Sequence, residues 1–291
     1  MPKTALVLSG GGAKGAFQLG AETYAREVKG FKWDIIAGIS VGALNATMLA
    51  MEKYDRLEYI WRTITPEQVY TGGLDLWSIF KLLLGAKSVY NNDPLWATMQ
   101  KEINPAEVKT DLRIGAVSLH TGAYLRYGPQ DPGFMEALLA STSIPLAFEP
   151  VFVPPDQEDV VDGGVRNYSP LGDVLDSEPE RIVVINCSPR QPPTRTEPFK
   201  NALEIGISTI DIMLNEIFVT DLEAFERINR NVREAEAFEG TLTNQKGKEY
   251  KAYEYYIIEP DEPLGETLDF SRDVLNMRLE AGWRKARQVL G

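Results

Sequence analysis

The chain has 291 residues, of which 44% are hydrophobic and 25% are charged, so it is long and apolar enough to bury a large core in one or two domains. Its 30 basic and 42 acidic residues give a net charge of −12, which argues against a nucleic-acid partner and against attraction to anionic lipid. The single cysteine, Cys187, excludes an intrachain disulfide. Together with the single histidine, His120, it leaves too few ligands for a zinc site of the usual His/Cys kind, so we expect no metal.

No segment has the pattern of a secretory signal or of a membrane-spanning helix. The apolar stretch after Lys3 covers only residues 4–8 and runs into glycines without a cleavage pattern. The longest uncharged run, residues 35–51, contains glycine, serine, asparagine and threonine, which makes it a poor bilayer span. We therefore expect a cytoplasmic protein.

The first fifty residues alternate between predicted strands and predicted helices. A buried strand over residues 4–9 ends at three glycines, and a helix follows over about 14–28. A short apolar run over 34–37 then leads through a second glycine-containing turn into residues 43–50, which are rich in helix formers. This order predicts an α/β fold, with a mostly parallel central sheet and helices on its faces.

The rest of the chain continues the same mixture of elements. Residues 55–104 are expected to be helical with interruptions, and a proline-rich linker is expected over 188–198. Further strands are predicted near residues 112–120, 124–127, 151–153, 181–186 and 250–258. Apolar residues spaced three to five apart from Leu203 onward predict an amphipathic helix of roughly 35 residues, and a closing helix is expected over 271–290.

The segment Gly38-Ile39-Ser40-Val41-Gly42 lies between a predicted strand and a predicted helix. This G-x-S-x-G pattern is typical of a nucleophile elbow, a sharp turn that exposes the serine hydroxyl. Glycines are needed on both sides of Ser40 where a side chain would collide with neighbouring backbone, and the helix N-terminus favours an anion nearby. The pattern favours Ser40 as a nucleophile; the alternative is a glycine-rich turn with an incidental serine.

A second glycine-rich turn, Gly10-Gly11-Gly12-Ala13-Lys14-Gly15, follows the first strand. Gly10, Gly12 and Gly15 fit G-x-G-x-x-G, so a dinucleotide-binding protein is an alternative. Against it, the acid that should end the second strand and bind the ribose, Asp34, begins that strand instead. Three consecutive glycines at a helix N-terminus instead suit an oxyanion hole, since their amides can point at one developing negative oxygen.

The third element is Asp162-Gly163-Gly164, an aspartate at a predicted strand end held in a tight turn. On its own this is a common turn, but beside Ser40 it supplies a base. A catalytic triad would have to use His120, and no histidine follows Asp162 in the order that α/β-hydrolases use. We therefore expect a Ser40–Asp162 dyad and a hydrogen-bonded, strand-end His120.

In this order, the Gly10–Gly15 turn, the Gly38–Gly42 elbow and Asp162-Gly163-Gly164 resemble the three signature elements of the patatin-like phospholipase family. The resemblance covers about residues 4–195. It implies a three-layer α/β/α sandwich with a patatin-like catalytic core over 1–195. From the pattern of the remaining residues we expect a C-terminal extension over 196–291, packed on the core as one continuous domain. That extension comprises the long helix, a strand and the closing helix.

The resemblance also implies roles for the signature residues. Ser40 is the expected nucleophile, Asp162 its base, and the amides of Gly10, Gly11 and Gly12 the oxyanion hole. The implied activity is hydrolysis of fatty-acyl esters of phospholipids or lysophospholipids through an acyl-serine, without a cofactor. A catalytically silent scaffold with the same fold remains an alternative.

An acyl ester needs an apolar binding surface, and residues 74–84, an almost wholly apolar run, are the candidate for it. Three roles stay open for this run: a cap over the site, a buried core helix, or a patch for transient contact with a membrane surface. Trp77, with Lys81 and Lys87 close by, suits a peripheral position at the membrane.

Overall fold

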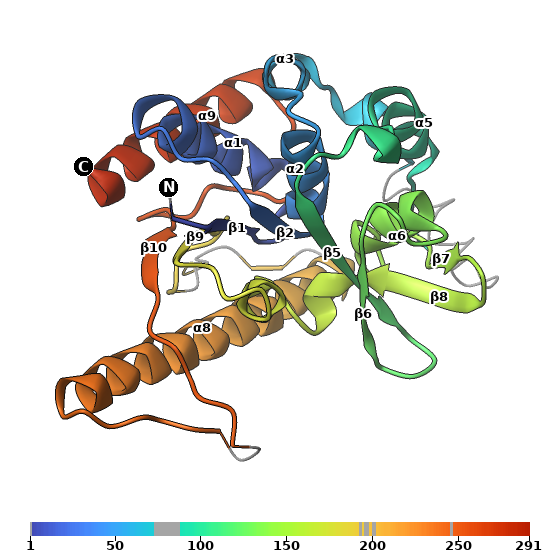
Figure 1. Ribbon diagram of the computed structural model, residues 1–291. Helices are drawn as coiled ribbons and strands as arrows, with labels where there is room; N and C mark the ends of the chain where they lie inside the picture. The colour runs from blue at the N-terminus through green and yellow to red at the C-terminus, as the bar shows by residue number, and fades with distance from the viewer. Residues whose placement is uncertain (1, 73–87, 192–193, 195–197, 200–201, 245–246) are drawn as a thin grey trace.

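A mixed β-sheet runs through the centre of the computed structural model, which describes residues 2–72, 88–191, 194, 198–199, 202–244 and 247–291 (Figure 1). Within these residues the sheet has eight strands in the order β10-β9-β1-β2-β5-β8-β7, with β6 also paired to β5. The strands are β1 (Thr4–Leu8), β2 (Ile35–Ile39), β5 (Asp111–Ser118), β6 (Tyr124–Tyr127), β7 (Val151–Val153), β8 (Gln157–Asp162), β9 (Arg181–Ile185) and β10 (Glu254–Ile258).

The five strands from β10 to β5 are parallel to one another. Strands β1 and β2 are buried over their whole length, as expected for continuous apolar runs covered on both faces. The parallel order brings the carboxyl ends of β1, β2 and β9 to one edge of the sheet. In open α/β sheets, ligands bind in the crevice at such an edge.

Strands β6, β7 and β8 are antiparallel to their neighbours and complete the other side of the sheet. Because β8 runs against β5, its last residue, Asp162, pairs with Ala116. Ala116 comes directly after Gly115, the β5 partner of Ile39 at the end of β2. The antiparallel direction of β8 therefore places Asp162 next to the turn that follows β2.

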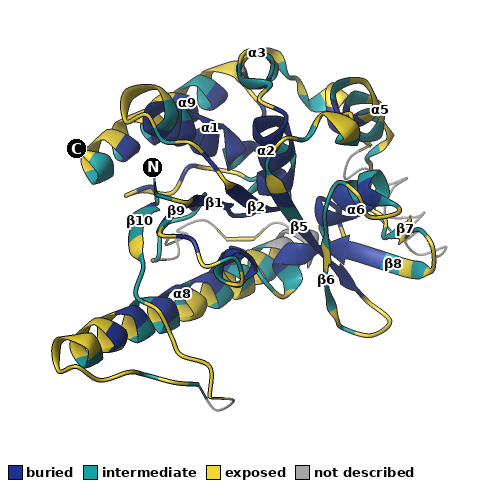
Figure 2. Cartoon of the chain, in the orientation of Figure 1, coloured by how far each residue is buried: buried dark blue, intermediate teal, exposed yellow. Residues whose placement is uncertain are grey.

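Helices cover both faces of the sheet, which makes the fold the expected three-layer α/β/α sandwich (Figures 1 and 2). On one face, alternate strand residues such as Leu6 and Leu8 pack with α1 (Gly15–Thr23), α2 (Val41–Ala50) and α9 (Arg272–Leu290). On the other face, Ala5 and Val7 belong to a second apolar cluster with α7 (Leu171–Leu175) and α8 (Ala202–Ala237).

The connection between β2 and β5 carries α3 (Tyr54–Thr63), a short hairpin of β3 (Thr71–Gly72) and β4 (Tyr90–Asn91), and α5 (Asp93–Glu102). Among the described residues, the expected interrupted helical region contains two helices, α3 and α5, with a short turn and the paired strands β3 and β4 between them. The apolar run 74–84 lies outside the described residues. Helix α6 (Phe134–Ser141) precedes β7 and has no counterpart in the sequence expectations.

The long helix expected after residue 203 is α8, which has 36 residues and extends along the lower face of the sheet (Figure 1). The strand expected over 250–258 begins only at Glu254, because the backbone of Tyr253 is bonded to the side chain of Asn229 on α8. The expected linker is also anchored: Arg190 forms ion pairs with Glu226 and Glu259, at 3.0 and 2.9 Å.

The C-terminal part of the chain is joined to the same sheet and helix layer as the rest. Strand β10 pairs with β9, and α9 lies against α1, where a β-carbon on Gly282 would come within 2.0 Å of the Phe17 carbonyl oxygen. The boundary between residues 1–195 and 196–291 stays a prediction.

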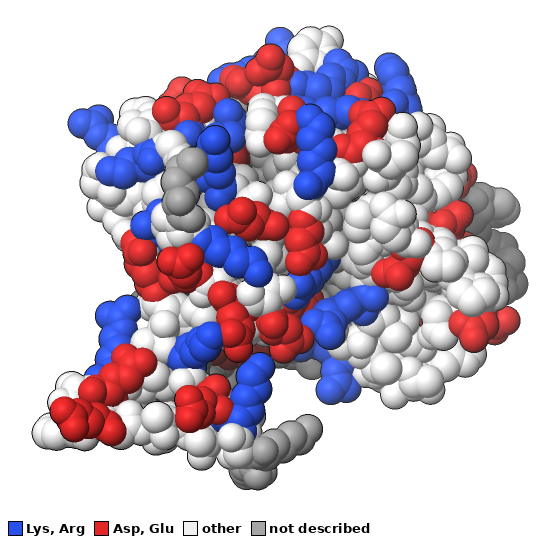
Figure 3. Space-filling view, in the orientation of Figure 1, with Lys and Arg blue, Asp and Glu red and all other residues white. Residues whose placement is uncertain are grey.

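Acidic and basic side chains are intermixed on the face shown in Figure 3. Among the described residues, no helix combines the length and the apolar character that crossing a bilayer requires.

Candidate active site

Ser40 occupies a strained turn between β2 and α2. Its φ of 56° and ψ of −130° are values that a side-chain-bearing residue rarely adopts, and strain of this kind concentrates at active sites. The flanking glycines are required by close backbone approach: a β-carbon on Gly38 would lie 2.2 Å from the Gly42 carbonyl oxygen. One on Gly42 would lie 2.4 Å from that of Ser9. The G-x-S-x-G pattern therefore forms a strand-turn-helix elbow, as the sequence predicts.

A distant segment supports this elbow. The Ser40 amide donates to the Ser141 hydroxyl at 3.0 Å, and Ser141 is completely buried at the end of α6. Two residues later, the Ser143 carbonyl accepts from the Asp162 amide at 3.0 Å. The segment 141–143 thus holds the backbone on both sides of the site, a role that the sequence analysis did not assign to it.

Asp162 lies at the end of β8 and is 5% exposed. One carboxylate oxygen, Oδ1, accepts from the Gly164 amide at 2.8 Å. Burial raises the pKa of Asp162 from 3.8 to about 7, and the Gly164 amide and the Ser40 side chain oppose that rise only in part. The pair combines a serine hydroxyl with a carboxyl group that titrates near neutral pH.

The glycine turn after β1 lies directly beside this pair. A β-carbon on Gly10 would come within 3.4 Å of the Ser40 β-carbon. Gly11 and Gly12 have φ values of 149° and 56°, and a side chain on either would collide with Cys187 or with the Thr267 carbonyl. Only glycine fits these two positions.

The amides of this turn are not equivalent as hydrogen-bond donors. The Gly10 amide donates to the Tyr168 carbonyl at 3.1 Å, so this N–H group already has an acceptor, and the expected contribution of Gly10 to an oxyanion hole stays a prediction. The next two amides, of Gly11 and Gly12, have no acceptor among the described residues. The Val41 amide is at the first position of α2, where a helix offers no internal acceptor.

A buried chain of polar side chains connects the two turns. Gln18 on α1 donates to the Ser9 carbonyl at 2.7 Å and accepts from Asn45 on α2 at 2.9 Å. Asn45 also donates to the Gly15 carbonyl and accepts from the Trp61 indole. Because buried polar groups are costly when unpaired, this network fixes the spacing between the glycine turn and the elbow. Nothing in the spacing of these residues along the sequence indicates it.

An apolar pocket of about 120 Å³ opens beside Ser40 and Gly12. Its walls come from α2, α3, α5, residues 142–148 and the segment that contains Leu268 and Phe270. Trp61 and Asn45 of the network line it as well. The space next to the serine hydroxyl is therefore lined almost entirely by apolar side chains.

The remaining sequence candidates lie elsewhere. His120 is exposed in the turn after β5, and its Nε2 is 2.9 Å from Asp159 Oδ2. Asp34 accepts from the Thr4 amide at 2.8 Å, at the amino ends of β1 and β2, so it is at the wrong end of the sheet to bind a ribose beside the glycine turn. The part of the chain that the structure describes contains no group of three or more His, Cys, Asp or Glu residues that could hold a metal ion.

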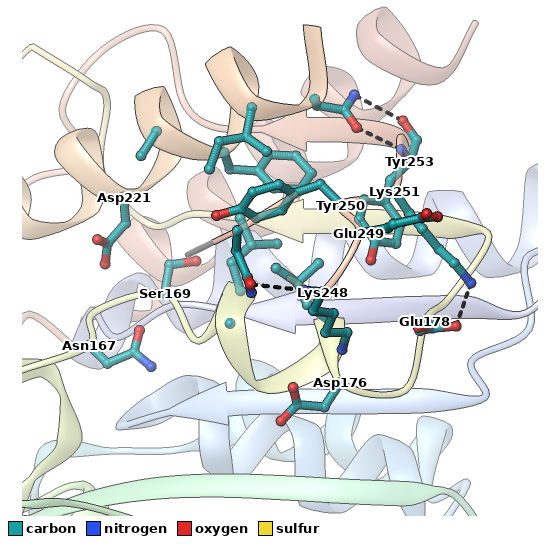
Figure 4. A pocket seen from close by; sticks show the side chains of 18 of the residues that line it. Asn167, Ser169, Asp176, Glu178, Asp221, Lys248, Glu249, Tyr250, Lys251 and Tyr253 are labelled. Atoms are coloured by element: carbon teal, nitrogen blue, oxygen red, sulfur yellow. Dashed lines mark hydrogen bonds and ion pairs between the residues drawn. The ribbon is translucent and has the colours of Figure 1, made fainter. Parts of the chain in front are cut away.

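A second and larger cavity, of about 630 Å³, lies on the α8 face of the sheet (Figure 4). Asn167, Ser169 and Asp221 line one side of it, and the ion pair of Lys251 with Glu178 lies on the other. Neither Ser40, Asp162 nor the glycine turn contributes to its lining. The two cavities are therefore separate, and the smaller one is the cavity that Ser40 and Gly12 line.

The family model described as patatin-like phospholipase matches residues 6–175. Among solved structures, VipD from Legionella pneumophila aligns with a TM-score of 0.47 at 13% identity, over 99% of this chain. The chain spans 66% of the length of that VipD chain. A search of curated proteins finds no match.

Proposed function

The chain belongs to the patatin-like phospholipase family, whose model matches more than half of it, and on this premise we propose that it is a serine acyl hydrolase with a Ser40–Asp162 dyad. The observation that carries the proposal is the pair itself. A strained, buried serine acts on a buried carboxyl group whose pKa is about 7, a value that suits a general base at neutral pH. The Gly11 and Gly12 amides are the proposed oxyanion donors.

In the first half of the reaction, Asp162 takes the proton of the Ser40 hydroxyl as Oγ attacks the ester carbonyl carbon. The carbonyl oxygen becomes an oxyanion, which the two glycine amides stabilise. The intermediate then collapses: the bond to the alcohol breaks, the alcohol leaves with the proton held by Asp162, and an acyl-Ser40 remains. The Val41 amide, at the positive end of α2, is a further candidate donor to the oxyanion.

In the second half, Asp162 takes a proton from water, and the hydroxide attacks the acyl carbonyl carbon. The same amides stabilise the second oxyanion. Its collapse breaks the bond to Ser40 Oγ, which recovers the proton from Asp162, and the fatty acid is released. Removing one oxyanion donor typically costs a factor of about 100 to 1,000 in kcat.

The apolar pocket beside Ser40 is the proposed binding site for the acyl chain. Each methylene group buried there contributes roughly 0.8 kcal/mol, so the pocket favours fatty-acyl over acetyl esters. We propose phospholipids or lysophospholipids as the substrate class, in agreement with the family.

A fluorophosphonate probe tests the proposal, because it reacts with an activated serine. We expect covalent labelling and hydrolysis of 4-nitrophenyl octanoate and of lysophosphatidylcholine by the wild-type chain. Both should be lost in Ser40→Ala and in Asp162→Asn.

Ser169→Ala is a matched control, because Ser169 is also a buried serine and its hydroxyl has no hydrogen-bond partner among the described residues. It should be labelled and should turn over like the wild type. Unchanged hydrolysis by purified Ser40→Ala, or no hydrolysis of any acyl ester by the wild-type chain, would refute the proposal.

A further inference from the structure

Arg278, on α9, is a completely buried arginine whose guanidinium faces a loop rather than an acid. All three of its hydrogen bonds go to backbone carbonyls: Nε to Leu264 at 2.9 Å, Nη1 to Asp269 at 2.9 Å and Nη2 to Glu266 at 2.8 Å. Within the described part of the chain it forms no ion pair. Burying a charge without an ion pair costs desolvation free energy, so a buried arginine of this kind indicates that the position of the groups it bonds is important.

The loop that Arg278 holds, residues 264–270, reaches the glycine turn. The Thr267 carbonyl accepts a hydrogen bond from the Ala13 amide at 2.8 Å. The same carbonyl oxygen would lie 2.4 Å from a β-carbon on Gly12, so the loop packs directly against the backbone of the turn. The Thr267 carbonyl therefore contacts Gly12 and holds the residue that follows it.

The same loop also closes the apolar pocket. Leu268 and Phe270 line the pocket beside Ser40, and the Leu268 carbonyl accepts from the Tyr70 hydroxyl at 3.3 Å. One planar side chain thus fixes three carbonyls of a loop that touches both the oxyanion donors and the acyl site. Arginine suits this role because its five N–H donors have a rigid, planar geometry.

We infer that Arg278 is a positioning residue for catalysis: through the 264–270 loop it holds the oxyanion turn and one wall of the acyl pocket in their working geometry. This inference rests on the proposed function. It extends the active site beyond the region that the family model matches, to a loop and helix about 100 residues further along the chain. Arg278 itself does not touch the substrate.

Arg278→Lys tests the inference, with Arg284→Lys as the control, since Arg284 is an exposed arginine on the same helix. An ammonium group cannot reproduce the planar set of three bonds, so the loop should shift. We expect kcat for both 4-nitrophenyl acetate and octanoate to fall by about 10- to 100-fold, since a misplacement of 1 Å has effects of that size. KM should rise for octanoate only, because only the longer chain fills the pocket wall formed by Leu268 and Phe270.

These readouts separate positioning from a merely structural role, which would lower the melting temperature and leave kcat per folded molecule unchanged. All rates are therefore measured well below the melting temperature of each variant, with the folded fraction checked by circular dichroism. Wild-type kcat in folded Arg278→Lys would overturn the inference. Absence of wild-type hydrolysis would instead overturn the proposed function, so the two failures are distinguishable.

Gly265→Ala provides a second perturbation of the same loop that leaves the buried charge in place. Gly265 is exposed, has a φ of +81°, and a β-carbon there would lie 3.5 Å from Arg278 Nη2. The strain should displace the loop without unfolding the protein, and kcat should fall by about threefold or more. If Arg278→Lys does not fold, an unchanged kcat in Gly265→Ala overturns the inference.

Discussion

The buried carboxyl group of Asp162 should make the protein less stable at alkaline pH, and Asp162→Asn should remove that penalty. The pKa of Asp162 in the folded chain is about 7, roughly three pH units above its ordinary 3.8. Each unit corresponds to about 1.4 kcal/mol, so ionised Asp162 lowers the free energy of unfolding by up to about 4 kcal/mol. An amide has nearly the same shape as the protonated acid and carries no charge at any pH.

The direction follows from proton binding. Because the folded state holds the Asp162 proton more tightly than the unfolded state, the contribution of this group to stability is greatest below pH 3.8. It falls as pH rises towards 7 and is constant above that value. Between pH 5.5 and 8.5 the free energy of unfolding of the wild type should therefore fall by about 2 kcal/mol relative to Asp162→Asn.

Urea denaturation of both proteins at pH 5.5, 7 and 8.5 measures this difference, and the same samples provide the kinetics. The kcat/KM of the wild type should rise about tenfold per pH unit below pH 7 and level off above it, because only ionised Asp162 can act as base. Parallel stability profiles for the two proteins would refute the reasoning, since they would mean that the folded chain leaves the pKa of Asp162 unchanged.

Three further predictions concern the turns and the pocket. Ser40→Gly and Ser40→Ala should both be inactive, but the glycine variant should be about 1 kcal/mol more stable in urea denaturation, because glycine relieves the strain at φ 56°. Gly12→Ala should lower kcat for an acetyl ester by at least about 100-fold with little change in KM, because the alanine side chain would collide with the Thr267 carbonyl. A kcat equal to that of the wild type would contradict this prediction. Leu44→Trp should partly fill the pocket and raise KM for 4-nitrophenyl octanoate about tenfold, while KM for the acetate ester hardly changes. An equal increase in KM for both esters would argue against the pocket as the acyl-binding site.

Local patterns predicted the elements that carry the proposed chemistry. The tight turns between strand and helix require glycine at Gly38, at Gly42 and after β1. Such turns can be recognised in the sequence because the glycines they require are close together along the chain. The fold class followed from the same strand-turn-helix alternation, and the comparison with family models confirms the family. The catalytic roles of Ser40 and Asp162 stay predictions that the experiments above test.

Contacts between distant segments explain what the sequence analysis missed or misplaced. The Gly10 amide was expected to be free, but it donates to Tyr168, more than 150 residues away. Ser141 supports Ser40 from 101 residues away. The 264–270 loop contacts the glycine turn although the two are still further apart along the sequence. A periodicity or motif within one segment does not predict such a contact.

The two glycine-bounded turns and the aspartate turn can be predicted from neighbouring residues, because backbone strain and the absence of a β-carbon are local properties. That these turns meet, that Arg278 holds a loop against one of them, and that the pKa of Asp162 rises to about 7 are properties of the folded chain. Desolvation and hydrogen-bond partnership depend on what the folded chain packs around a group, and here most of that packing comes from residues far along the sequence.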